Sequence, residues 1–174
     1  MPHYFSTFRN ENDNSVETVV IQSLQNNNSE ESIFVLVKEE KTYKPILNLK
    51  ITSELSSPFK DTQVFNDTVL IGWGDTFTVF NLVTKKQSII SLDGYFGNFR
   101  IHDNKIFVCS ASDVTCMSVD GEIKWKSESI AIDGVIINFF EKETIYCSCE
   151  WDPPGGWRPY QLDLLTGITV KNIS

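Results

Sequence analysis

A unit of about 40 residues recurs along this chain, and each copy is built from short strands. Residues 93–99 (DGYFGNF) are echoed by residues 133–139 (DGVIINF), with four identical residues at a constant offset of 40. Residues 105–108 (KIFV) then match residues 144–147 (TIYC), and an earlier copy lies at residues 68–71 (TVLI). Repeats of this length that hold about four short strands are typical of β-sheet arrays, in which neighbouring units bury each other's apolar faces.

The local periodicity agrees with the repeat. Runs rich in Val, Ile, Phe and Thr alternate with turn sequences such as SLDG, IHDN, VDGE and LTG. This pattern predicts many short antiparallel strands and hence an all-β protein made of four-stranded meanders. In EIKWKS, Ile123 and Trp125 alternate with lysines, so we expect Trp125 to lie in the core.

The units resemble the blades of WD-repeat and quinoprotein-like β-propellers, over residues 56–174 as three units and over 16–50 as a fainter fourth. The combination of a Gly-His pair with a later Trp-Asp pair that defines true WD repeats is missing. The resemblance implies a small or incomplete propeller-like array, with a β-sandwich or an open barrel as the alternative. At 174 residues we expect one all-β domain. Its predicted parts are a loose N-terminus at 1–15 and repeat units at about 16–50, 56–92, 93–132 and 133–174.

The third well-matched unit carries an insertion. Between equivalent strand positions the first two units run from residue 73 to 80 and from 110 to 117, whereas the third runs from 149 to 162. The six extra residues fall in EWDPPGGWRP, and insertions in repeat proteins often mark the binding face. The alternative is that both tryptophans of this loop fold back over the end of the sheet. The predicted partner-binding residues are Trp73, Asp75, Glu150, Trp151, Asp152, Trp157 and Arg158.

Catalytic and metal-binding patterns are weak. His102, Asp103 and Ser110 supply the residue types of a hydrolytic triad, but no Gly-x-Ser-x-Gly elbow presents the serine. No glycine-rich phosphate loop precedes a helix. The four cysteines lack paired Cys-x-x-Cys spacing, so we expect buried thiols rather than a metal site. We therefore predict a non-enzymatic protein with no catalytic residues, no metal and no cofactor. The free thiols are Cys109, Cys116, Cys147 and Cys149.

A net charge of −8 suits either an ordinary soluble acidic protein or one that attracts a basic partner. Nucleic-acid binding is disfavoured because no cluster of Lys and Arg could contact phosphates. The chain has no apolar run long enough for a membrane helix and no signal sequence at residues 1–15, so we expect a cytoplasmic protein without membrane contact.

In overall type the chain resembles the acidic immunity proteins of bacterial polymorphic toxin systems, including contact-dependent growth inhibition. That resemblance implies binding to a cognate toxin, such as a basic nuclease, and blocking of its active site. It carries over no residue. The alternatives are a propeller-type scaffold that recruits a cellular protein, and a small module that binds glycans or peptides through the aromatic loop.

Overall fold

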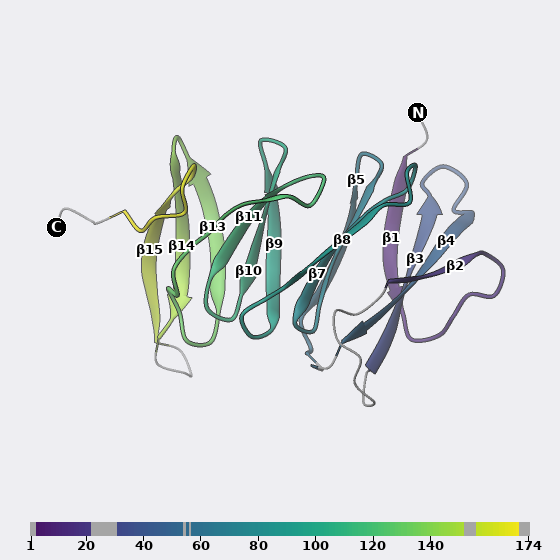
Figure 1. Ribbon diagram of the computed structural model, residues 1–174, viewed down its shortest axis with the longest axis horizontal. Helices are drawn as coiled ribbons and strands as arrows, with labels where there is room; N and C mark the ends of the chain where they lie inside the picture. Colours follow the sequence, from purple (N-terminus) through teal and green to yellow (C-terminus); the bar gives the residue numbers. More distant parts are fainter. Residues whose placement is uncertain (1–2, 22–30, 54, 56, 152–155, 171–174) are drawn as a thin grey trace. The chain divides into compact units, whose positions relative to one another are not determined.

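The computed structural model describes residues 3–21, 31–53, 55, 57–151 and 156–170, and these contain strands and turns but no helix (Figure 1). The prediction of an all-β protein is confirmed. The strands form four sheets, none of which closes into a barrel within the described residues. Sequence reasoning predicts one domain, whereas the contacts cluster in two compact units, Met1–Ser91 and Leu92–Ser174, with two sheets in each.

The first sheet of unit 1 differs from the predicted meander. Its strand order is β1-β3-β4-β2, and β2 runs parallel to β4. Its N-terminal strand also corrects the expectation of a loose segment at 1–15, because Tyr4 and Phe8 pack against the core of the unit and hold β1 along β3. The strands are β1 (Tyr4–Arg9), β2 (Thr18–Ile21), β3 (Glu31–Glu39) and β4 (Pro45–Ser53).

The second sheet of unit 1 is a four-stranded antiparallel meander, as the repeat predicts. It contains β5 (Lys60–Phe65), β6 (Thr68–Trp73), β7 (Thr76–Asn81) and β8 (Gln87–Ser91). All of these strands lie inside the predicted unit at 56–92. Side chains from both sheets form one apolar cluster, in which Val35 and Leu49 of the first sheet are buried with Val69 and Ile71 of the second.

Unit 2 pairs a second meander with a three-stranded sheet. In the third sheet, β9 and β10 join through Asp103 and Asn104, which both adopt positive φ as a tight hairpin turn requires. The strands are β9 (Phe96–His102), β10 (Lys105–Ser110), β11 (Val114–Ser118), β12 (Ile123–Lys126), β13 (Val135–Glu141), β14 (Thr144–Glu150) and β15 (Trp157–Asp163). They fall inside the predicted units at 93–132 and 133–174.

The core of unit 2 lies between these two sheets and contains all four cysteines, which are buried and free as predicted. Burial raises the pKa of Cys147 and of Cys149 to about 12. Trp125 packs against this cluster, as its alternation with lysines predicts, and its Nε1 donates to the carbonyl of Leu164 at 3.3 Å. Gly167 lies flat on the same indole, because a Cβ there would stand 2.3 Å from its Cε3 atom.

The repeat extends to individual hydrogen bonds. In the turn after β7, the Asn81 side chain accepts from the amides of Val83 and Thr84 at 3.0 and 2.8 Å. In the turn after β15, Asp163 accepts from the amides two and three residues on at the same two distances. Lys85 and Gly167 close these turns with φ of 59° and 71°. The aligned segments FNLVT and LDLLT therefore fold into the same turn.

Candidate binding surface on the last sheet

The seven predicted site residues do not form one group. Trp73 and Asp75 belong to unit 1, whereas Glu150, Trp151, Trp157 and Arg158 belong to the β14–β15 hairpin of unit 2. Asp152 lies outside the described residues, together with the Pro-Pro-Gly that follows it. Each group is therefore considered in its own unit.

The unit 1 pair is structural. Trp73 is only 4% exposed and belongs to the apolar cluster of the unit, so its indole offers no surface to a partner. This corrects its assignment as a binding residue. Asp75 is partly exposed, and its Oδ1 accepts a hydrogen bond from the Ser53 hydroxyl at 2.8 Å. Between them, Gly74 has φ of +63° and leaves no room for a Cβ beside Ser53. The turn thus ties β6–β7 to the end of β4.

The pairing of β14 with β15 separates the two tryptophans of the insertion. Glu150 lies directly opposite Trp157, and the Trp151 amide donates to the Gly156 carbonyl at 3.1 Å. Trp151 packs against the core and stacks on Tyr160 with ring centroids 6.4 Å apart. Its Nε1 is buried without a hydrogen-bond partner among the described residues. Trp157, in contrast, is 42% exposed. Trp151 therefore folds back over the sheet, as one of the two alternatives predicts for both tryptophans, whereas Trp157 does not.

The indole of Trp157 rests on the start of β13. A Cβ built on Gly134 would stand 3.2 Å from its Cη2 atom, and the φ of this glycine is +154°. The backbone beneath is fixed by two bonds to Glu150, whose amide donates to the Gly134 carbonyl at 2.9 Å and whose carbonyl accepts from Ile132 at 2.8 Å. The exposed ring therefore sits on ordered backbone beside the Glu150 carboxylate.

Asp133 anchors the same end of the sheet. The Tyr95 hydroxyl donates to its carbonyl at 2.6 Å, with its Oδ1 at 3.0 Å. Burial, together with this carboxylate, raises the pKa of Tyr95 to about 12, so the hydroxyl keeps its proton at neutral pH. Asp133 is an exposed carboxylate at this end of the unit, whereas Glu150 is buried, and Arg158 is an exposed cation one residue beyond Trp157.

Trp157 belongs to a larger apolar surface that the sequence analysis did not predict. Ile145, Cys147 and Cys149 turn one face of β14 into the core, so the alternate residues occupy the opposite face. We call that opposite side the outer face of β13–β15. Its apolar members are Ile136, Phe139, Tyr146 and Trp157.

A β-bulge sets which phenylalanine reaches the outer face. The register of β13 shifts between Ile137 and Phe139, so that Phe139 pairs with Tyr146 while Phe140 turns into the core. Phe139 is 52% exposed, and its ring stacks on that of Tyr146 with centroids 4.4 Å apart. The side-chain amide of Asn138, the bulged residue, donates to the Ser148 hydroxyl at 2.9 Å. The alternation in TIYCSCE could have indicated the outer face of β14. No sequence pattern indicated the bulge in β13.

The residue types of a hydrolytic triad are far apart. His102 pairs with Lys105 at one end of β10, whereas Ser110 ends that strand five residues on, roughly 16 Å away. The His102 ring stacks on Phe140 with centroids 4.2 Å apart, and its Nε2 lies 3.5 Å from Asp103. These contacts make His102 a packing residue. Within the described part of the chain, no three His, Cys, Asp or Glu side chains are placed to hold a metal ion.

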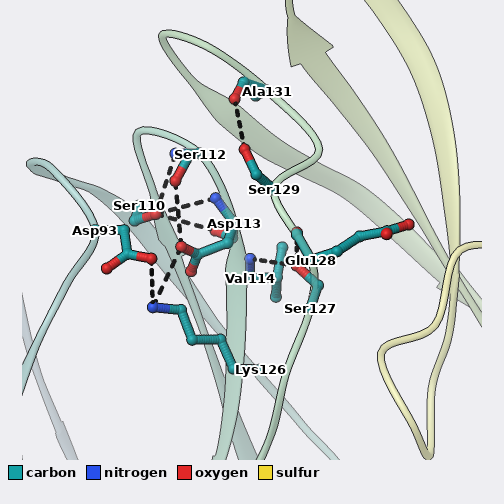
Figure 2. Close-up of polar contacts among 10 residues, drawn as sticks. All are labelled: Asp93, Ser110, Ser112, Asp113, Val114, Lys126, Ser127, Glu128, Ser129 and Ala131. Atoms are coloured by element: carbon teal, nitrogen blue, oxygen red, sulfur yellow. Dashed lines mark hydrogen bonds and ion pairs between the residues drawn. The ribbon is translucent and has the colours of Figure 1, made fainter.

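Ser110 instead serves the β10–β11 turn, which is the short counterpart of the inserted hairpin (Figure 2). Its hydroxyl accepts from the amides of Ser112 and Asp113 at 3.1 and 3.0 Å. Asp113 is buried, and burial raises the pKa of its carboxyl even though Lys126 stands 3.5 Å away. Lys126 also pairs with Asp93 at 2.9 Å. The network therefore closes the β10–β11 turn.

A cleft of about 600 Å3 lies in unit 1, where β1 runs into the following loop. The polar groups there mainly fold the loop itself, because Asn12 accepts from Thr18 and Asp13 accepts from Ser15. Lys60 stands 5.3 Å from the centre of the Phe8 ring. The lining consists of Phe8, Arg9, Asn10, Glu11, Asn12, Asp13, Asn14 and Lys60.

No protein-family model and no curated protein sequence matches this chain. Among solved structures, it is similar to the crystal structure of the computationally designed Ika4 protein, with a TM-score of 0.50 and 13% sequence identity. The match covers 69% of this chain and 76% of the designed one. At this identity the likeness concerns the fold alone. No helix within the described residues is long and apolar enough to cross a membrane.

Proposed function

We propose that this chain is a non-catalytic domain that binds another protein at the β14–β15 hairpin of unit 2. The observation that carries the proposal is the placement of Trp157, which is exposed, supported from below by Gly134 and flanked by the Glu150 carboxylate. Trp and Arg are the residue types most enriched at interface hot spots, and Arg158 follows directly.

The charge of the chain favours a basic partner. The net charge is −8, and the exposed carboxylate of Asp133 lies at the hairpin end of unit 2. Opposite charges accelerate association and exclude acidic competitors. This chemistry agrees with the expected role of an immunity protein, which would neutralise a cognate toxin in the cytoplasm by covering its active site. A basic nuclease is the toxin class that such a surface would suit.

The test is capture of the partner from the native host by the immobilised protein, followed by mass spectrometry and measured association rates. We expect a basic protein whose affinity falls at least tenfold with Trp157→Ala. Tyr43→Ala, which removes a 69% exposed aromatic from unit 1, should leave it unchanged. The association rate should fall as salt rises, because steering is screened over about 10 Å at 0.1 M. Equal loss with both variants, or a rate that salt does not alter, would contradict the proposal.

The immunity role has its own readout. Expression of the captured protein alone should arrest cell growth, and co-expression of this chain should restore it, whereas co-expression of the Trp157→Ala variant should restore it less. A harmless partner from a signalling complex would instead indicate a scaffold, and quenching of Trp157 by a sugar would indicate a glycan-binding module.

A further inference from the structure

The outer face of β13–β15 is uncovered, whereas the other three sheets are buried on both faces of an inner strand. Adjacent residues on a strand point to opposite faces, so their burial shows whether both faces are covered. In the last sheet Ile145 is fully buried, but its neighbour Tyr146 is partly exposed. In the other sheets both adjacent residues are at most 1% exposed, and these residues are Val35 and Leu36, Val69 and Leu70, and Ile106 and Phe107.

The ring of Phe139 on this face stands where the sister sheets carry polar residues. In the pairing of the aligned segments, Phe139 occupies the position of Gln63 in the second sheet and of Arg100 in the third. Gln63 and Arg100 are both exposed, so the position faces water in all three sheets and carries an aromatic ring in the last one alone. With Ile136, which is 42% exposed, Phe139 forms an apolar strip along β13. Contiguous apolar surface of this kind marks interaction sites in soluble proteins.

The first sheet is closed to a second copy by the chain itself. Leu36 and Asn48 lie opposite each other on the face that points away from the core of unit 1, and both are buried. The Asn48 amide group donates to the side chain of Asn12, which places the loop after β1 over this face. A second copy therefore cannot stack its first sheet on β13–β15 as in a head-to-tail repeat array. The outer face of its own β13–β15 remains, and contact between two identical faces gives a closed two-fold dimer.

The charges at one end of the face distinguish two orientations of such a dimer. Glu141 and Asp163 lie at the same end, on β13 and β15. A two-fold axis parallel to the strands would place these carboxylates over the same end of the second copy, where like charges repel. An axis across the strands places them over the Trp157 end instead. It also keeps β13 over β13, so that Phe139 of each copy lies over Ile136 of the other.

We infer that the outer face of β13–β15 closes on the same face of a second copy, in a two-fold dimer whose axis crosses the strands. Three strands of seven residues cover roughly 23 Å by 14 Å, or about 320 Å2 for each copy. A stable complex buries about 800 Å2 on each partner, so this dimer is weak, with a dissociation constant on the order of 100 μM. Such a dimer goes beyond the proposed function, and because Trp157 lies at the end of the same face, it competes with the proposed partner for this surface.

Sedimentation equilibrium of the whole chain, from about 10 μM to about 1 mM, measures the self-association. Phe139→Gln is the informative variant, because the second sheet already holds a glutamine at the equivalent position. Tyr43→Gln is the matched control, because it removes an exposed aromatic from unit 1. We expect a monomer–dimer equilibrium that Phe139→Gln weakens at least tenfold and that Tyr43→Gln changes less than twofold. A chain that stays monomeric over the whole range, or a dimer that tolerates Phe139→Gln, would overturn the inference.

The orientation has a separate test by nuclear magnetic resonance. A nitroxide is attached to Glu141→Cys, and this variant is mixed with the nitrogen-15-labelled native chain, whose signals alone are recorded. The four native cysteines are buried, so the label goes to the new one. An axis across the strands should broaden the indole N–H signal of Trp157. Broadening of the Asp163 amide instead would show an axis along the strands and overturn the orientation, and no broadening at all would overturn the dimer.

Both measurements use the protein alone, so their outcome is separate from that of the proposed function. A monomeric chain that still captures a partner through Trp157 would overturn the dimer and leave the hairpin as the binding site. A dimer that depends on Phe139, combined with a captured partner that ignores Trp157→Ala, would support the dimer and overturn the hairpin proposal.

Discussion

Phe139 and Phe140 are neighbours of the same residue type on opposite sides of one sheet, and their truncation should have very different costs. Phe140 packs on the core of unit 2. The centroid of its ring lies 4.2 Å from that of His102 and 5.0 Å from that of Phe107. Phe→Ala in a core costs about 3–5 kcal/mol, so about 3 kcal/mol is expected for this partly buried ring. Phe139 is half exposed and its ring stacks on that of Tyr146, so its truncation should cost about 1 kcal/mol.

The difference of about 2 kcal/mol is measurable by urea unfolding. With a slope of roughly 2 kcal/mol per molar urea, the midpoint of Phe140→Ala should fall about 1 M below that of Phe139→Ala at unchanged slope. Strict alternation from Ile137 would bury Phe139 and expose Phe140, so the experiment tests the bulge at Asn138 directly. A larger loss for Phe139→Ala would show that the outer face is assigned to the wrong side of the sheet.

The remaining predictions concern three buried groups. Gly167→Ala should lower the free energy of unfolding by more than about 2 kcal/mol, because its Cβ would overlap the Trp125 ring; a near-neutral result would refute that contact. Cys147, with its pKa raised to about 12, should react with a thiol reagent at pH 8 only after unfolding, and rapid labelling of the native protein would count against its burial. The raised pKa of Asp113 means that folding favours its protonated form. The stabilisation from Asp113 is complete below the pKa of about 3.8 that the residue has in the unfolded chain, and it is lost as pH rises through the folded pKa. The urea midpoints at pH 4 and pH 7 should therefore differ less in Asp113→Asn than in the native chain. An unchanged difference would contradict this assignment.

Where side chains alternate strictly, the sequence predicted the structure. TIYCSCE places its two cysteines inside, and EIKWKS places Trp125 against the core, because each polar neighbour fixes the side of the next residue. TVLIGW has no such polar alternation, and periodicity therefore could not show that Trp73 is buried. The prediction of a loose N-terminus was wrong for a different reason. The strand β1 is stabilised by pairing with β3, which is distant from it in the sequence.

The candidate site depended on features that local patterns do not contain. Trp151 and Trp157 look equivalent in the sequence, and only the pairing of Glu150 with Trp157 sends one inward and the other outward. Phe139 reaches the surface through a bulge whose position depends on the neighbouring strand. The six-residue insertion was measured against sister units of the same chain, and it lies between β14 and β15. The propeller-like arrangement of the units stays a prediction.

In the first sheet, the face that carries Asn48 is covered by a loop of the same chain. There Asn48 is fully buried, its amide group donates to the side chain of Asn12, and its backbone amide donates to the Glu17 carbonyl at 2.9 Å. The loop after β1 thus lies over that face, and Leu36 beneath it is also buried. Hydrogen bonds offset the cost of burying the nitrogen of this side-chain amide, while its Oδ1 is buried without a hydrogen-bond partner among the described residues. Phe139 presents the opposite case, an aromatic ring on an outer face with neither a polar partner nor a covering loop among the described residues. Removing such a ring from water is favourable by roughly 25 cal/mol for each Å2 of apolar surface covered, and this free energy is not gained while the ring stays exposed.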